Sequence, residues 1–240
     1  MPDRAALVTG ASSGIGLAIA HALGDDGYAL TVAARRPEKL AAAVAELRAA
    51  GHDVVDVAAN LTEEEDIKAV VAAHRNAFGR LDVLVNSAGV GFGAPAGEHQ
   101  TKRVDMQLDL NLRAIVLFYR ETVDLLKAAG AEHRNALVVN LASISGKVGQ
   151  PWLSVYSATK AAVIGYTQAM NTELNGDGVK SVALCPGFVD TPMTEFIKQQ
   201  VPPEAMIQTA DVAEAVRFVL RTSPTCVIPE IVFQRPGESL

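Results

Sequence analysis

The chain has 240 residues, of which 49 % are hydrophobic and 20 % are charged, with a formal net charge of −6. This composition is typical of a folded chain, and because Lys and Arg form no basic stripe, nucleic acid is not an expected partner. No apolar run reaches the roughly 20 residues that a membrane span needs, and no N-terminal signal pattern is evident. We therefore expect a cytoplasmic protein with one domain, residues 1–240.

Short apolar segments alternate with segments of helical period along the chain. Strands are predicted over residues 5–9, 28–34, 53–57, 81–86, 136–141, 179–185 and 226–233. Helices are predicted over about 14–24, from Pro37 to Gly51, from an N-cap at Thr62, over 99–129, from near Trp152 to Asn175, and over 210–221.

The predicted strands show no clean alternation of polar and apolar residues, which is typical of parallel strands buried on both faces. Strand–helix alternation with right-handed crossovers then predicts an α/β fold. We expect a Rossmann-like, doubly wound parallel sheet of about seven strands with helices on both faces. Pro229 indicates that the last strand lies at a sheet edge or starts there. The two cysteines are too few for a disulfide framework, and no spacing indicates a metal site.

A glycine-rich turn, TGASSGIG at residues 9–16, separates the first strand from the first helix. Glycines let the backbone approach a ligand closely, and a helix N-terminus offers free N–H groups to a pyrophosphate. The spacing is a variant of the dinucleotide-binding pattern. A tight turn without a ligand is the alternative interpretation. The segment 86–89 ends the fourth strand, where the topology places it near the ribose of a bound dinucleotide.

The end of the second strand bears on the choice between NAD and NADP. An acid there binds the ribose 2′-hydroxyl, whereas a basic residue accommodates a 2′-phosphate. Here the strand ends in Arg35 and Arg36, with no Asp or Glu. Two guanidinium groups favour NADP(H) over NAD(H), and Ser12 and Ser13 can add hydroxyl donors. The alternative is that both arginines are solvated charges at a helix start.

Tyr156 and Lys160 lie four residues apart in a predicted helix, so they share one face. A tyrosine hydroxyl titrates near about 10, and a nearby cation lowers that pKa toward the range useful for acid–base catalysis. Ser143 follows the fifth strand, where its hydroxyl can bind a substrate oxygen. Taken alone, a Tyr and a Lys at this spacing are more often a surface pair.

Together and in this order, the motifs make the chain resemble the short-chain dehydrogenase/reductase family over about residues 5–233. The family's TGxxxGxG turn, NxAG strand end, Asn, Ser, YxxxK and PG motif correspond to residues 9–16, 86–89, Asn111, Ser143, 156–160 and 186–187. The resemblance implies that Tyr156 gives or takes the proton and that Lys160 binds the nicotinamide ribose and lowers the pKa of Tyr156. It also implies that Ser143 positions the substrate oxygen and that Asn111 holds a relay water.

The resemblance further implies a cofactor site and a homodimer or homotetramer. The residues expected to contact the cofactor are Gly10, Ser12, Ser13, Gly14, Ile15, Gly16, Arg35, Arg36, Asn60, Leu61, Asn86, Ala88, Gly89, Tyr156, Lys160, Pro186, Gly187, Val189 and Thr191. Asn60 stands where the family commonly has an Asp facing the adenine amino group, so that contact is expected to be weaker.

The segments after the fourth, fifth and sixth strands predict a mostly apolar substrate pocket. Its expected wall comprises Phe92, Trp152, Leu153, Phe188, Met193 and Phe196, with residues 188–208 as a lid. The main hypothesis is an NADP(H)-dependent carbonyl reductase or alcohol dehydrogenase acting on a small molecule. One alternative is a 3-oxoacyl-thioester reductase, for which Lys127 and Arg134 are the candidate docking cations. The other is a non-catalytic, dinucleotide-binding regulator.

Overall fold

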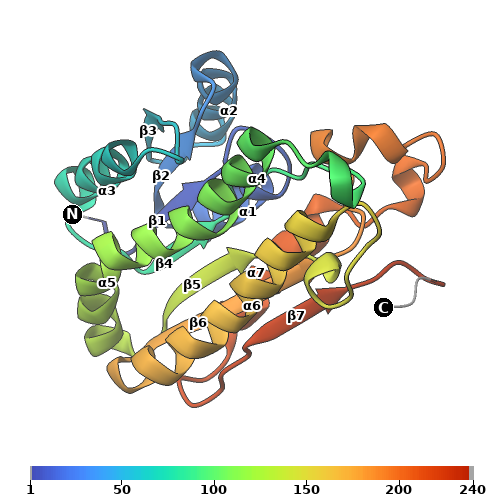
Figure 1. Ribbon diagram of the computed structural model, residues 1–240. Helices are drawn as coiled ribbons and strands as arrows, with labels where there is room; N and C mark the ends of the chain where they lie inside the picture. The colour runs from blue at the N-terminus through green and yellow to red at the C-terminus, as the bar shows by residue number, and fades with distance from the viewer. Residues whose placement is uncertain (1, 238–240) are drawn as a thin grey trace.

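The computed structural model describes residues 2–237, which form one seven-stranded sheet in the order β3-β2-β1-β4-β5-β6-β7 (Figure 1). All neighbouring strands are parallel. The strands are β1 (Ala5–Thr9), β2 (Ala29–Ala34), β3 (Val54–Ala58), β4 (Val83–Asn86), β5 (Ala136–Leu141), β6 (Val179–Pro186) and β7 (Glu230–Phe233). The predicted Rossmann-like sheet is confirmed, and its strand order reverses between β1 and β4, where ligands bind in this architecture.

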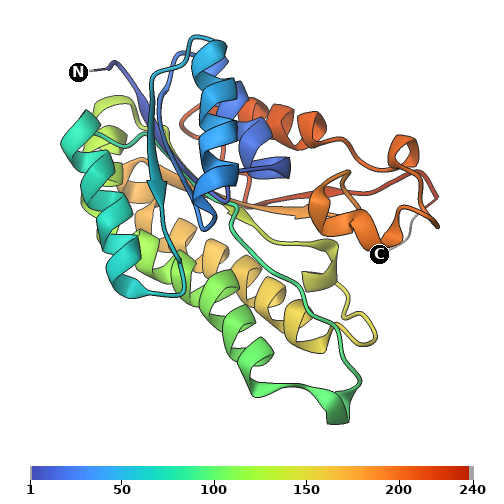
Figure 2. The ribbon, with the colours of Figure 1, turned by 90° about the horizontal axis from the view of Figure 1, so that it is seen from above.

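Helices cover both faces of the sheet, as the view from above shows (Figure 2). One face carries α1 (Gly14–Asp25), α2 (Pro37–Ala49) and α7 (Thr209–Arg221), and the other carries α3 (Glu64–Phe78), α5 (Ala114–His133) and α6 (Ser154–Leu174). Strand residues alternate between the two cores: Val8 packs with the first set of helices and Leu7 with the second. No helix among residues 2–237 combines the length and apolar character that crossing a membrane requires.

The segment predicted as helix over 99–129 contains two helices joined by an irregular turn. Helix α4 (Thr101–Leu108) is followed by a π-turn at Asp109–Arg113 and then by α5. The N–H of Ala114 bonds to the carbonyl of Asp109, five residues back, as a π-turn requires. Such turns are frequent at functional sites, and this one carries Asn111.

The strands β2, β3 and β4 begin one or two residues later than predicted, and the starts of α3 and β7 differ for local reasons. Glu63, not Thr62, is the N-cap of α3 and makes no capping bond; the Thr62 hydroxyl bonds instead to the Glu63 carboxylate at 3.3 Å. Strand β7 begins at Glu230, so residues 226–229 are not strand. It starts directly after Pro229 at the edge of the sheet, because proline lacks the N–H that a ladder needs.

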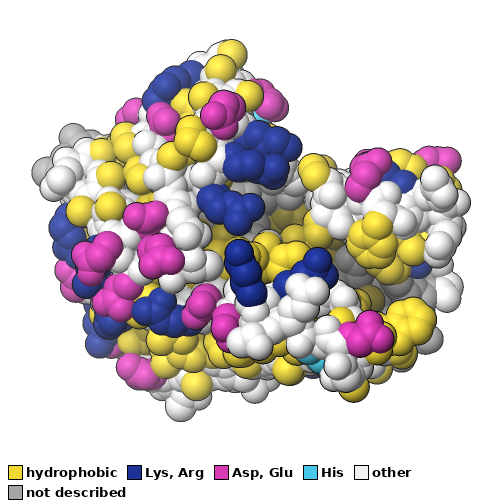
Figure 3. Space-filling view, turned by 45° about the horizontal axis from the view of Figure 1, so that its top comes forward, with side chains coloured by type: hydrophobic (Ala, Val, Ile, Leu, Met, Phe, Trp, Pro, Cys, Tyr) yellow, Lys and Arg dark blue, Asp and Glu magenta, His cyan; other side chains and the backbone are white. Residues whose placement is uncertain are grey.

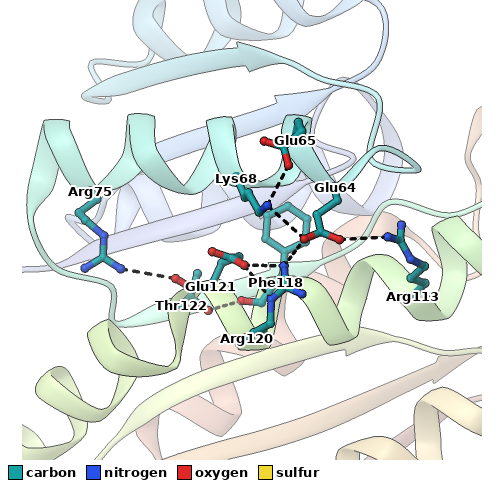
Figure 4. Close-up of polar contacts among 9 residues, drawn as sticks. All are labelled: Glu64, Glu65, Lys68, Arg75, Arg113, Phe118, Arg120, Glu121 and Thr122. Atoms are coloured by element: carbon teal, nitrogen blue, oxygen red, sulfur yellow. Dashed lines mark hydrogen bonds and ion pairs between the residues drawn. The ribbon is translucent and has the colours of Figure 1, made fainter.

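Ion pairs connect α3 to α5, which lie side by side (Figure 4). The Glu64 carboxylate contacts Lys68 at 3.2 Å, Arg113 at 3.2 Å and Arg120 at 2.7 Å, and Arg75 contacts Asp124 at 2.8 Å. The Arg120 hydrogen bond is the largest cause of a lowered pKa at Glu64. Each exposed pair stabilises little by itself. Because Arg113 belongs to the π-turn, the cluster also links that turn to α3.

Candidate active site

The glycine-rich turn lies at the carboxyl end of β1, and its backbone requires glycine. Gly10 has φ +66° and Gly14 has φ +58°, in the left-handed region that other residues seldom adopt. A Cβ on Gly16 would lie 2.6 Å from the Gly10 carbonyl oxygen. Ser13, the N-cap of α1, makes no side-chain capping bond, so the first N–H groups of α1 are left uncapped for an anion.

Thr9 ties the end of β1 to the segment after β4. Its hydroxyl accepts hydrogen bonds from the N–H groups of Ser87, at 3.1 Å, and Ala88, at 3.2 Å. The same hydroxyl donates to the Val85 carbonyl at 3.2 Å. The two predicted cofactor segments, 9–16 and 86–89, therefore lie against each other at the switch point of the sheet.

The residues predicted to select the cofactor follow the ends of β2 and β3. Arg35 and Arg36 are exposed, and within residues 2–237 neither guanidinium has an ion-pair or hydrogen-bond partner. Figure 3 shows a hollow in the surface with Lys and Arg side chains gathered along one side. The Asn60 N–H donates to the Asp66 carboxylate at 2.6 Å.

Tyr156 and Lys160 share one face of α6, as predicted. The Lys160 Nζ lies 5.7 Å from the centroid of the Tyr156 ring and donates to the Leu141 carbonyl at 2.6 Å. Burial raises the pKa of Tyr156, and a hydrogen bond with the Ser143 side chain opposes that shift. Burial lowers the pKa of Lys160 to about 8. The expected lowering of the Tyr156 pKa by Lys160 is thus not found in the protein alone, where desolvation dominates.

Ser143 stands at the end of β5, beside the PG segment. Its hydroxyl accepts a hydrogen bond from the Ser145 N–H at 3.1 Å and lies 3.5 Å from the Pro186 carbonyl oxygen. The second contact is long for a hydroxyl donor, so its proton is available to a stronger acceptor. Ser143 can therefore present an O–H to a ligand oxygen.

Asn111 adjoins Lys160 across Gly89. A Cβ on Gly89 would lie 3.2 Å from Asn111 Oδ1 and 3.5 Å from Lys160 Nζ. The Asn111 amide donates to the Val90 carbonyl at 2.8 Å and to the Thr159 hydroxyl at 3.1 Å, and its Oδ1 accepts from the Val90 N–H at 2.9 Å. Both N–H groups of the Asn111 side-chain amide already donate hydrogen bonds. A relay water at Asn111 would therefore have to donate to an oxygen atom and could not accept from this amide.

The segment after β6 returns to the glycine-rich turn. A Cβ on Gly14 would lie 3.1 Å from the Thr191 Cγ2 atom. Residues 188–208, the expected lid, are closed at their base by a parallel bridge between Val189 and Ile207. Lys198 adds an ion pair to Asp190 at 3.0 Å. This segment extends away from the sheet (Figure 2).

The expected apolar wall is largely open to solvent. Trp152, Met193 and Phe196 are 71 %, 53 % and 75 % exposed. Phe92 and Phe188 are half-buried, with guanidinium groups 5.5 Å from their ring centroids, Arg103 over Phe92 and Arg235 over Phe188.

The two candidate docking cations lie away from this site. Lys127 is ion-paired with Asp177 at 2.8 Å, and Arg134 lies two residues before β5, at the amino ends of the strands. Their place near the end of α5 puts both cations far from the carboxyl ends of the strands. Conversely, sequence reasoning missed Gln107, a buried amide on α4 that bonds to the loop beside Tyr156. A polar residue one helical turn before Asn111 was the available signal.

Comparison with known proteins identifies the family. A model of the family described as short chain dehydrogenase matches residues 4–202. The chain belongs to the short-chain dehydrogenase family. It is 34 % identical over 226 residues to a 3-oxoacyl-[acyl-carrier-protein] reductase of Staphylococcus aureus, and the match covers 90 % of each chain.

Two solved structures resemble this short-chain dehydrogenase along nearly all of its length. A single-residue variant of actinorhodin polyketide ketoreductase with NADPH is 33 % identical with a TM-score of 0.86, and the match covers 96 % of this chain and 94 % of the ketoreductase. A 3-ketoacyl-(acyl-carrier-protein) reductase of Brucella melitensis complexed with NADH is 28 % identical with a TM-score of 0.86, covering 97 % and 96 %. The protein is thus an oxidoreductase of this family, and its neighbours hold either nicotinamide dinucleotide.

Proposed function

We propose that this protein is an NADP(H)-dependent carbonyl reductase in which Tyr156 protonates the carbonyl oxygen. The observation that carries the proposal is the convergence of Ser143, Tyr156 and Lys160 beside the Gly89 segment, next to a glycine-rich turn that fits a pyrophosphate. Arg35 and Arg36, with no acid at the end of β2, support a cofactor that carries a 2′-phosphate.

The nicotinamide, when bound, supplies the hydride for the carbonyl carbon. Ser143 donates its hydroxyl proton in a hydrogen bond to the carbonyl oxygen and so fixes its position. Tyr156 then transfers its phenolic proton to that oxygen as the alcohol forms. Because burial raises the pKa of Tyr156, this residue is a protonated donor at neutral pH, which is the form that reduction needs. Lys160, with a pKa of about 8, holds a proton at neutral pH that can replace the one Tyr156 gives up.

A 3-oxoacyl thioester is a second candidate substrate, favoured by one specific observation. Arg103 and Lys102, at the start of α4, are exposed, and neither has an ion-pair partner within residues 2–237. Arg103 lies over Phe92, on the loop that borders Tyr156. These cations suit the phosphate of a thioester carrier arm better than Lys127 and Arg134 do. The ketoreductase relatives support the same substrate class.

Initial rates of NADPH and NADH oxidation against ketones, aldehydes and a 3-oxoacyl thioester test the proposal. Tyr156→Phe should lower the rate of reduction by about 100-fold or more, while the Kd for NADPH stays within about twofold. Tyr166→Phe is the matched control, because Tyr166 lies on the same helix and its ring packs against Tyr119 at 5.3 Å. Wild-type turnover by Tyr156→Phe would overturn the assignment. NADPH binding without turnover of any compound would favour the alternative of a non-catalytic, dinucleotide-binding regulator.

A further inference from the structure

Helix α4 buries an amide and exposes a leucine, the reverse of the usual arrangement. Among residues 101–108 the buried residue is Gln107, with 1 % of its surface exposed, while the neighbouring Leu108 is 43 % exposed. Burying an amide is costly unless its hydrogen bonds are made. The contacts of Gln107 therefore indicate why this residue occupies the position.

Gln107 holds the loop that follows β4. Its Oε1 accepts a hydrogen bond from the Phe92 N–H at 3.0 Å, and its Nε2 donates to the Arg103 carbonyl at 3.3 Å. Asn111, one helical turn later, bonds to both backbone groups of Val90. Two amides on one face of the chain thus fix the backbone on either side of Gly91.

Gly91 lies against the ring of Tyr156. A Cβ at this position would be 3.3 Å from Tyr156 Cδ2 and 3.4 Å from Cε2, so the loop backbone passes beside the ring and leaves little room for a side chain. The next part of the loop is bonded to the start of α6, where the Ala94 N–H donates to the Trp152 carbonyl at 2.8 Å. Residues 90–92 therefore form a wall between α4 and Tyr156, and Gln107 sets one end of it.

We propose that Gln107 is a positioning residue that fixes the 90–92 wall over Tyr156 and thereby places the substrate carbonyl relative to the phenol. The inference rests on the proposed function, because it matters only if Tyr156 is the proton donor. Gln107 bonds to backbone groups of Phe92 and Arg103 and acts through the Phe92 N–H. Losing its acceptor frees one end of the wall and leaves the glycine-rich turn unchanged.

Gln107→Met removes the acceptor at similar side-chain length, and Gln107→Glu retains an acceptor oxygen for the Phe92 N–H. For Gln107→Met we expect kcat for carbonyl reduction to fall about tenfold, the size of one lost hydrogen bond. The Kd for NADPH should stay within about twofold, and hydrogen exchange at the Phe92 amide should accelerate. Gln107→Glu should recover most of the lost kcat and the protection of that amide.

Asn171→Leu is the matched control, because Asn171 is also a buried amide that bonds to backbone, at Ser181, and it lies far along α6 from Tyr156. It should lower the Tm without changing kcat. Unchanged kcat in Gln107→Met, or an equal loss in Asn171→Leu, overturns the inference. If Gln107→Met does not fold, a Gln107→Glu variant in which one of the two, kcat or Phe92 protection, is lost while the other is kept overturns it as well. An active Tyr156→Phe would instead mark the failure of the proposed function.

Discussion

The ammonium of Lys160 is buried 5.7 Å from the centroid of the Tyr156 ring and is held there by the carbonyl of Leu141, at 2.6 Å. Burial is the first cause of the lowered pKa of Lys160, which falls from 10.5 to about 8. Keeping Lys160 protonated at neutral pH therefore lowers the free energy of unfolding of the protein, by an amount that depends on pH.

Lys160→Met should change how stability depends on pH. In the wild type, the unfolded chain binds a proton at Lys160 between pH 8 and 10.5 that the folded chain has released. Its free energy of unfolding should therefore rise relative to that of Lys160→Met across this window, by about 3 kcal/mol. Urea unfolding of both proteins at several pH values measures the difference. Parallel curves from pH 7 to 10.5 would show that the ammonium is not buried as described.

The rates of reduction and of oxidation should depend on pH in opposite ways. Because the pKa of Tyr156 is raised above 10, the phenol should stay protonated from pH 6 to 9. Reduction of a ketone should keep its rate while Lys160 holds its proton, up to about pH 8, and should fall at higher pH. Oxidation of the corresponding alcohol needs the phenolate, so its rate should rise with pH. We would measure kcat/KM in both directions from pH 6 to 10. Oxidation that slows as the pH rises would contradict this assignment of Tyr156.

Local patterns were sufficient to predict the strands and the motif-bearing turns. The run at 136–141 is a strand with the predicted bounds, because a short apolar segment flanked by polar residues has few other stable conformations. The helical spacing of Tyr156 and Lys160 was correct because four residues complete about one turn. These features depend on neighbours in sequence, which a single chain contains.

Contacts between distant segments could not be predicted in the same way. Nothing in the sequence near Thr191 indicates that it packs on Gly14. Nothing near Thr62 indicates that Asp66 bonds to the Asn60 N–H. The sequence around Thr62 also does not show that Glu63 is the N-cap of α3. Gln107 resembles an ordinary polar helix residue until the fold brings residues 90–92 beside it. Such side chains are held by backbone groups of distant segments. The positions of those groups in space cannot be read from the residues near the side chain in sequence.

Replacing Arg35 and Arg36 with alanine should weaken NADPH binding much more than NADH binding, since only NADPH carries the 2′-phosphate. Two charge-assisted hydrogen bonds correspond to a loss of about 10- to 100-fold for NADPH. Fluorescence titration of both cofactors measures the two Kd values. Arg221→Ala, an exposed arginine at the end of α7, should change neither value. Equal losses for NADPH and NADH would show that these arginines do not select the cofactor.

His74 should make the fold sensitive to acid. Its ring is fully buried, with Nε2 2.8 Å from the Arg80 carbonyl oxygen and Nδ1 2.8 Å from the Thr31 hydroxyl. A carbonyl accepts only, so Nε2 carries the proton and Nδ1 accepts from Thr31 in the neutral ring. Burial lowers the pKa of His74 from 6.5 to about 4.

The unfolded chain therefore binds a proton at His74 between pH 6.5 and 4 that the folded chain does not, so the stability that the neutral ring provides is lost as the pH falls through this window. The expected loss is about 3 kcal/mol. His74→Gln removes the titrating group, so its free energy of unfolding should be lower at pH 7, because the histidine contacts are gone, but should fall less steeply toward pH 4. Denaturant unfolding of both proteins at pH 7, 6, 5 and 4 tests this. An unchanged slope in His74→Gln would assign the acid sensitivity to other groups, such as the Asp82 carboxylate with its lowered pKa beside Arg80.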